Sequence, residues 1–138
     1  MIKQIDHIGI AVSMLDQQVP FYRDILRLEF IGIEEVPEQK VKTALFQIGE
    51  VRIELLEPTS PESPIAKFIE KRGEGLHHIA YRSDGIVDEI AFFKGMNVSM
   101  IDELPRDGVN GSKIAFLHPK SSGKVLTEIC QIAGEVNE

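Results

Sequence analysis

Apolar and polar residues alternate in several short stretches of this chain, and two of these stretches contain histidine at matching places. They are IDHIGIAV near the start and GEGLHHIAY in the middle. In a β-strand, successive side chains point to opposite faces. His7 then shares a face with Gly9, and His78 shares a face with Ala80. Each histidine therefore has a small neighbour that leaves room beside it.

A helical pattern, two further strands and a strand carrying a glutamate follow each histidine strand. In the first half we expect these five elements at residues 5–12, 15–26, 30–36, 41–48 and 51–57. In the second half we expect them at 73–81, 86–94, 98–101, 113–117 and 125–132. A linker rich in proline and serine, then a short helix IAKFIEKR ending before Gly73, separates the halves.

The helix ends carry their own sequence signals. Ser13 and Asp16 both fit as caps of the first helix, and Asp84 fits as the cap of the helix in the second half. Pro20 is expected close to the start of its helix, since a proline deep inside a helix removes a hydrogen bond and clashes with the preceding turn.

The two halves match by a nearly constant shift. The shift from His7 to His78 is slightly shorter than the shift from Glu54 to Glu128, and the longer turn HPKSSG in the second half accounts for the difference. A repeat of this length is a duplicated module, and each half is too small to close its own core. We therefore expect one domain over residues 1–138, with module 1 at about 1–58, the linker and short helix at 59–73, and module 2 at about 74–134.

Four polar residues occupy equivalent places in the repeat: His7, Glu54, His78 and Glu128. Taken alone, a strand histidine is usually a hydrogen-bonded residue, and a strand glutamate usually faces solvent. Duplication would bring the equivalent positions to one centre, where two buried carboxylates would repel each other and be costly to desolvate. A divalent metal removes that cost. Two imidazoles and two carboxylates suit zinc, cobalt, nickel, manganese or iron.

Two other histidines are expected outside this site. His77 falls on the opposite face of its strand from His78, and His118 precedes Pro119 at a strand end, where a turn or capping role is expected.

Composition narrows the partners. The formal net charge of −7 argues against nucleic acid or an acidic membrane surface. No apolar run approaches the length of a membrane span, and no signal peptide is expected. The single cysteine, Cys130, cannot form an internal disulfide and suits a reducing compartment. We expect a cytoplasmic protein.

Several segments resemble a known family. FYRDILRLEF in the first helix resembles the vicinal oxygen chelate superfamily, which includes the glyoxalases. VPEQKVKTALFQIG, IELLEP, SPIAKFIEKRGEGLHHIAY and FLHPKSSGKVLTEICQ are similar, more narrowly, to the methylmalonyl-CoA epimerases. This resemblance implies an α+β fold of two βαβββ modules around a metal, a homodimer, and methylmalonyl-CoA as the substrate, whose (R) and (S) epimers are interconverted through an enolate.

The resemblance also implies roles for the repeated residues. His7, Glu54, His78 and Glu128 would hold one divalent ion (cobalt, zinc, nickel or manganese), and Glu128 would also move the proton. One position departs from the pattern, because Thr43 stands where some epimerases carry a second catalytic glutamate. Two alternatives stay open: a glyoxalase-like lactoylglutathione lyase, and a non-catalytic ligand-binding protein of the same fold.

Overall fold

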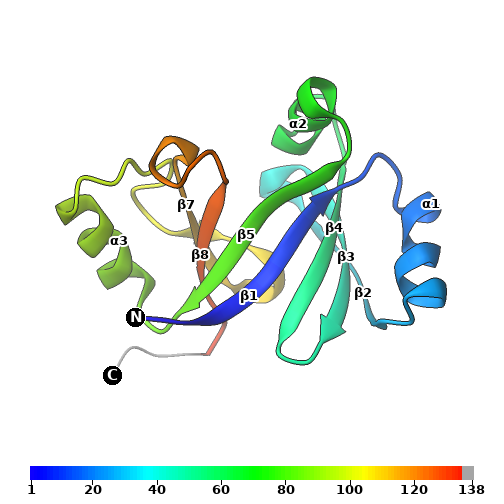
Figure 1. The fold of residues 1–138 in the computed structure, drawn as a ribbon, viewed down its shortest axis with the longest axis horizontal. Helices are drawn as coiled ribbons and strands as arrows, with labels where there is room; N and C mark the ends of the chain where they lie inside the picture. Colours follow the sequence, from blue (N-terminus) through cyan, green and yellow to red (C-terminus); the bar gives the residue numbers. More distant parts are fainter. Residues whose placement is uncertain (135–138) are drawn as a thin grey trace. The chain divides into compact units, whose positions relative to one another are not determined.

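A computed structural model of the chain describes residues 1–134, which contain eight strands and three α-helices (Figure 1). The strands are β1 (Ile2–Ala11), β2 (Glu29–Val36), β3 (Val41–Ile48), β4 (Val51–Pro58), β5 (Gly75–Ser83), β6 (Arg106–Asp107), β7 (Lys113–Leu117) and β8 (Thr127–Gln131). The helices are α1 (Leu15–Pro20), α2 (Pro64–Arg72) and α3 (Ile86–Gly95). The order is βαβββ, a helix, then βαβββ, which confirms the predicted α+β fold of two repeated modules.

The chain forms two compact units whose boundaries fall inside strands. The N-terminal unit is His7–His77, and the C-terminal unit is Met1–Asp6 together with His78–Glu138. Within the N-terminal unit the hydrogen-bonded strand order is β2-β3-β4-β1, and within the C-terminal unit it is β1-β5-β8-β7-β6. β1 therefore contributes its first residues to one unit and its last residues to the other.

In the N-terminal unit, α1 covers one face of the sheet (Figure 1). The residues buried there are Val12, Leu15, Val19, Ala44, Phe46 and Leu55, with Ile10, Tyr22, Leu28, Phe30 and Ile53 packed against them. Because strand side chains alternate between faces, the residues between these positions point to the other face. That second face carries His7, Glu54 and Thr43, as the strand register shows.

The first helix continues past Pro20. Phe21–Ile25 forms a π-helical turn directly after α1, in which the N–H of Leu26 donates to the carbonyl oxygen of Phe21 at 2.9 Å. Pro20 thus lies well inside the helical stretch, and the expectation that it sits near the start was wrong. A π-helical turn is a local widening of the helix, and here it follows the position where proline supplies no N–H donor.

In the C-terminal unit, α3 covers one face of the sheet in the same way. The residues buried between α3 and the sheet are Ile86, Ile90, Ala115, Leu117 and Ile129, with Tyr81, Phe93, Val98 and Met100 packed against them. The opposite face buries a second cluster, Ala80, Ile114, Phe116 and Cys130, with Leu126 beside it.

The strand predicted at residues 98–101 was wrong. In this segment only an isolated bridge joins Met100 to Leu117, while the short strand β6 pairs with the start of β7 instead. The carboxylate of Asp102 accepts the backbone N–H of Phe116 at 2.9 Å. The Asp102 side chain thus occupies a backbone donor that would bond to a neighbouring strand in a continuous β-ladder. The apolar residues that indicated a strand pack under α3 without forming one.

The helix caps also differ from those predicted. The first N–H of α1, at Leu15, donates to Glu57 of β4 at 2.7 Å, and that of α3, at Ile86, donates to Gln131 of β8 at 2.9 Å. Asp84 accepts the N-terminal ammonium at 2.8 Å instead of capping α3, and this hydrogen bond holds the pKa of its carboxyl below the usual value. Neither Ser13 nor Asp16 caps α1, which has no side-chain bond from its N-cap residue.

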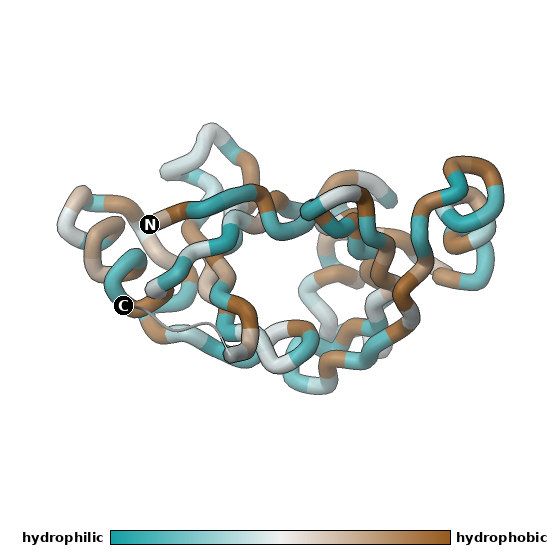
Figure 2. The backbone as a smooth tube through the Cα atoms, turned by 90° about the horizontal axis from the view of Figure 1, so that it is seen from below, coloured by the Kyte–Doolittle hydropathy of each residue, from teal (hydrophilic) through white to brown (hydrophobic). Residues whose placement is uncertain are grey.

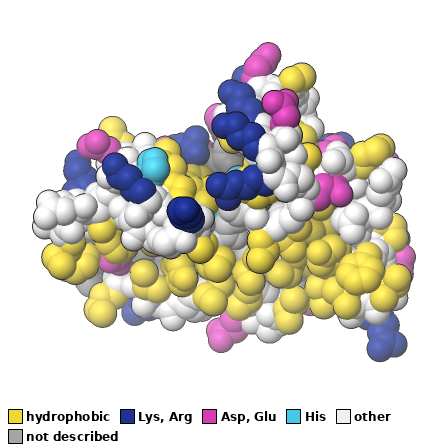
Figure 3. All heavy atoms as spheres, turned by 45° about the horizontal axis from the view of Figure 1, so that its top comes forward, with side chains coloured by type: hydrophobic (Ala, Val, Ile, Leu, Met, Phe, Trp, Pro, Cys, Tyr) yellow, Lys and Arg dark blue, Asp and Glu magenta, His cyan; other side chains and the backbone are white. Residues whose placement is uncertain are grey.

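Polar and apolar residues are interspersed along the chain. Hydrophilic and hydrophobic residues alternate in short stretches along the backbone (Figure 2), as expected for strands with two unlike faces. Lys and Arg side chains gather over α2 (Figure 3), where Lys67, Lys71 and Arg72 are exposed. Among residues 1–134, none of the helices has the length and apolar character needed to cross a membrane.

Candidate metal centre

The N-terminal unit brings His7 and Glu54 together from two adjacent parallel strands. Nδ1 of His7 lies 3.5 Å from Oε2 of Glu54, and both side chains are buried. The strand register sets this geometry, because Glu54 is the Cα partner of Gly9, two positions beyond the histidine. Gly9 has no side chain, which leaves room for the glutamate. The prediction that His7 has open space beside it on its own face agrees with this arrangement.

Arg52 lies on the same face of the sheet as His7 and Glu54, which we call the site face. Its Nη2 and Nε atoms both donate to Oε2 of Glu54, at 2.9 and 3.3 Å. Arg52 is not among the sequence-predicted site residues. The signal for it was present in the spacing, since alternate residues of a strand lie on the same face.

The C-terminal unit repeats the pairing with His78 and Glu128. Nε2 of His78 lies 3.0 Å from Oε1 of Glu128, and both side chains are buried. Glu128 is the Cα partner of Ala80, which again lies two positions beyond the histidine. The ring of Phe116 stands edge-on to His78, with the ring centroids 5.5 Å apart. Phe116 thus places an apolar ring against the histidine.

The two units therefore place histidine and glutamate by the same rule. In each, a histidine strand runs parallel to a glutamate strand, and the glutamate faces the small residue two positions after the histidine. The repeat inferred from spacing is thus present in the register. That all four side chains hold one ion stays a prediction.

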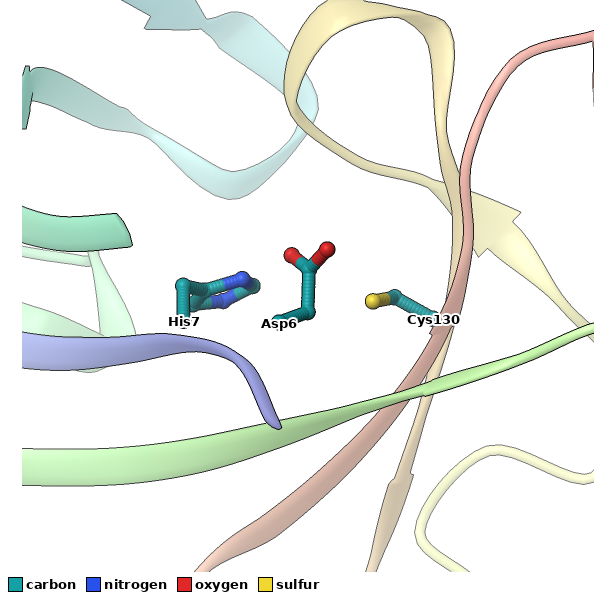
Figure 4. A group of neighbouring side chains, drawn as sticks. All are labelled: Asp6, His7 and Cys130. Atoms are coloured by element: carbon teal, nitrogen blue, oxygen red, sulfur yellow. The ribbon is translucent and has the colours of Figure 1, made fainter. Parts of the chain in front are cut away.

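A second polar group in the C-terminal unit was not predicted. Oδ1 of Asp6 accepts hydrogen bonds from Nε and Nη2 of Arg82, at 3.0 and 2.8 Å. A carboxylate oxygen of Asp6 and Sγ of Cys130 lie within 4.8 Å of each other (Figure 4). Asp6 directly precedes His7 in β1, so the Arg82 ion pair helps to fix the strand at the point where the histidine follows.

Thr43 has an unusual environment. Its side chain is fully buried on β3, and Oγ1 is the one buried side-chain nitrogen or oxygen atom in residues 1–134 that lacks a hydrogen-bond partner. Its Cα partner is Leu56, two positions beyond Glu54 on the same face of β4. A hydroxyl buried without a partner is costly, so a water bound at this point of the site face would be stabilising.

The two histidines excluded from the site lie where they were expected. The ring of His77 stands edge-on to Phe68 of α2, with the centroids 4.9 Å apart. Nδ1 of His118 accepts the backbone N–H of Lys120 at 3.1 Å and caps the turn that begins at Pro119. The predicted turn role of His118 is confirmed, and that neither histidine binds a metal stays a prediction.

The chemistry of the paired residues fits a divalent cation. Each unit supplies one imidazole nitrogen and one carboxylate oxygen from buried side chains, and these donor types are the usual ligands of zinc and of the other first-row metals. In each unit the carboxylate is buried, and a nearby cation lowers the cost of burying its charge. Donor type alone does not select the metal.

Comparison with known proteins defines the class. Residues 6–116 match the family model of the "Glyoxalase/Bleomycin resistance protein/Dioxygenase superfamily". The chain therefore belongs to this superfamily.

Similar proteins show to which family within this superfamily the chain belongs. A solved methylmalonyl-CoA epimerase in complex with methylmalonyl-CoA and NH₄⁺ is 38% identical, with a TM-score of 0.94 and full coverage of both chains. The ethylmalonyl-CoA/methylmalonyl-CoA epimerase of Cereibacter sphaeroides is 32% identical over 96% of this chain and all of that protein. A hypothetical protein from Bacillus halodurans C-125 is 48% identical, with a TM-score of 0.93 and 98% coverage of both chains. Within the superfamily, the chain is a member of the methylmalonyl-CoA epimerase family.

Proposed function

We propose that the chain is an isomerase that interconverts the (R) and (S) epimers of methylmalonyl-CoA. The observation that carries the proposal is its full-length likeness, at 38% identity, to an epimerase solved with methylmalonyl-CoA. The two buried pairs, His7–Glu54 and His78–Glu128, supply the chemistry that this reaction needs.

The reaction removes the hydrogen on the carbon between a thioester and a carboxylate, then returns it on the other face. Its difficulty is the enolate, whose negative charge must be stabilised where it develops. We assign His7, Glu54, His78 and Glu128 to hold one divalent ion, with cobalt, zinc, nickel and manganese as candidates. Such an ion would supply Lewis-acid stabilisation for that charge.

We assign Glu128 the role of moving the proton. A carboxylate serves as a general acid or base when one of its oxygens reaches the substrate. His78 lies 3.0 Å from Oε1 of Glu128 and fixes the orientation of the carboxylate. The burial of both side chains, with Phe116 against His78, keeps bulk water away from the proton being moved.

The opposite face of the substrate needs a second proton carrier. Thr43 occupies the position where some epimerases have a glutamate, and a hydroxyl is too weak an acid or base to replace a carboxylate. Its unpartnered Oγ1 is able to bind a water molecule. We propose a positioned water as the second carrier.

Three broader expectations belong with this proposal. The lone Cys130 and the absence of a disulfide in the described residues suit a reducing compartment, so we propose the cytoplasm. The net charge of −7 opposes nucleic acid as a partner. We also propose a homodimer, on the resemblance to the epimerase family.

Incubation with methylmalonyl-CoA in deuterated water tests the activity. We expect one deuterium to enter at the α-carbon, detected by mass spectrometry, together with interconversion of the epimers. If metal-loaded protein gives no exchange but converts a glutathione hemithioacetal, it is a glyoxalase-like lyase. Conversion of neither compound would favour the remaining alternative, a non-catalytic ligand-binding protein of the same fold.

A further inference from the structure

Arg52 forms the closest contact to Glu54 and has no role in the function proposed above. Its Nη2 atom lies 2.9 Å from Oε2 of Glu54, and its Nε atom lies 3.3 Å from the same oxygen. Nδ1 of His7 also faces Oε2, at 3.5 Å. These contacts all converge on one carboxylate oxygen, so the guanidinium leaves Oε1 as the oxygen available to a metal.

We propose that Arg52 is a positioning residue that acts through Glu54. It fixes the orientation of the carboxylate by hydrogen bonds to Oε2. Its positive charge would also give a metal-loaded centre a net positive charge, which would attract an anionic oxygen of the substrate. This inference rests on the proposed function in taking Glu54 and Glu128 as ligands of one ion.

Burial makes the contact strong. The side chain of Glu54 is 2% exposed and that of Arg52 is 18% exposed. Hydrogen bonds between charged groups are about twice as strong as neutral ones, and removing one partner of a buried pair leaves an uncompensated charge. Arg52 therefore makes it possible to bury Glu54 before any metal is bound.

Charge counting gives the functional consequence. Glu54 and Glu128 together carry −2, and a divalent ion would bring the sum to zero with both histidines neutral. Arg52 raises the sum to +1. An enolate oxygen, or the carboxylate of the substrate, would then meet a centre of opposite charge, and electrostatic stabilisation of developing charge is a major part of catalysis.

At this position of the repeat, only module 1 carries a charge. The shift that relates Glu54 to Glu128 places Leu126 at the position equivalent to Arg52. Leu126 packs against the apolar cluster of its own unit. The two glutamates thus have different neighbours at matching places: a guanidinium beside Glu54, and an aliphatic side chain near Glu128. This difference suits a fixed ligand in module 1 and a proton-moving ligand in module 2.

The first test is a double-mutant cycle on the metal-free protein. Arg52→Met keeps the apolar stem and removes the charge, and Glu54→Gln removes the charge that Arg52 holds. We expect Arg52→Met to lower the melting temperature by about 10 °C in the wild-type background, because the carboxylate is left unpaired. In the Glu54→Gln background we expect a change below about 2 °C. Arg23→Met, at an exposed arginine bonded to Asp24, is the matched control and should have little effect.

The second test measures oxalate binding to cobalt-loaded protein by calorimetry, with metal content checked by elemental analysis. Oxalate is a small dianion and serves here as a probe of charge. We expect Arg52→Met to weaken oxalate binding at least tenfold, the scale of about 1.4 kcal/mol, and Arg52→Lys, which keeps the charge, to stay within threefold.

Three results would overturn the proposal. An equal loss of melting temperature in both backgrounds would make Arg52 a packing residue only. Unchanged oxalate affinity at full metal content would remove the charge argument, as would a wild-type protein that binds no divalent metal. None of these measurements uses methylmalonyl-CoA. A failed exchange assay would therefore refute the proposed activity and leave the role of Arg52 to be decided separately.

Discussion

Nε2 of His78 lies 3.0 Å from Oε1 of Glu128, on two neighbouring parallel strands of the C-terminal unit. The equivalent residues of the N-terminal unit approach through Nδ1 of His7, at 3.5 Å from Glu54. Each unit thus holds a buried nitrogen and oxygen donor pair by its own strand register.

Metal content is the first prediction. Purified protein should hold one divalent ion per chain, because two imidazoles and two carboxylates are donor types that suit a divalent metal. His7→Ala and His78→Ala should each lose most of the ion, since either change removes a nitrogen ligand. Elemental analysis measures the occupancy.

His77→Ala is the matched control for the metal prediction. Its ring packs on Phe68, so this variant should keep its metal. Full occupancy in both His7→Ala and His78→Ala would show that the four residues are not the ligands.

Proton transfer by Glu128 gives the second prediction. Glu128→Gln should abolish deuterium incorporation even where metal is retained, because an amide still offers an oxygen ligand but cannot accept the proton. The loss should reach the range of about 10²–10⁴-fold typical of general acid–base groups. Exchange at the wild-type rate in metal-loaded Glu128→Gln would assign the proton to another group.

Thr43 gives the third prediction. Thr43→Val replaces the unpartnered hydroxyl with a methyl group of similar size, so the proposed water would lose its anchor. Deuterium exchange should then fall by the roughly 10²–10⁴-fold typical of general acid–base groups, with metal content unchanged. Mass spectrometry measures the exchange, and elemental analysis measures the metal. If the hydroxyl only lines the site, deuterium exchange should stay within roughly tenfold of wild type.

That smaller loss, together with a rise of about 1–3 kcal/mol in the free energy of unfolding, would contradict the proposed water. If the water is bound, the variant should lose stability, because it also loses the water. Chemical denaturation measures the stability of the variant.

The helix caps give the fourth prediction. Glu57→Ala should destabilise the protein by about 0.5–2 kcal/mol, since the N–H of Leu15 loses its acceptor. Glu57→Gln should retain most of the stability, because Gln131 performs the same task for Ile86. Thermal unfolding of the two variants compares them directly, and equal losses would mean that the charge of Glu57 matters more than its hydrogen bond.

The alternation of apolar and polar residues predicted those strands that have one apolar face. His7, Glu54, His78 and Glu128 could be singled out because a nearly constant shift relates them, and a repeat carries information that a lone histidine does not. The pairing of each histidine with its glutamate then follows from parallel strands in matching register.

Long-range contacts account for what the sequence did not reveal. Glu57 and Gln131 cap helices that begin far from them along the chain, whereas local cap rules consider only neighbouring residues. The segment at 98–101 has a strand-like composition but gives up a ladder bond to the carboxylate of Asp102. Arg52 could be placed on the correct face, but its bond to Glu54 depends on side-chain conformation, which spacing does not fix.

The two caps also record how the copies have diverged. Leu15 and Ile86 are separated along the chain by the same interval as His7 and His78, and Glu57 and Gln131 by the same interval as the two site glutamates. One copy caps its helix with an acid and the other with an amide, so the oxygen acceptor persists although the charge does not. Each glutamate strand therefore carries a site glutamate on one face and the residue that caps a helix on the other. Substitutions in either copy of this strand must therefore preserve both the site glutamate and an oxygen acceptor for the helix.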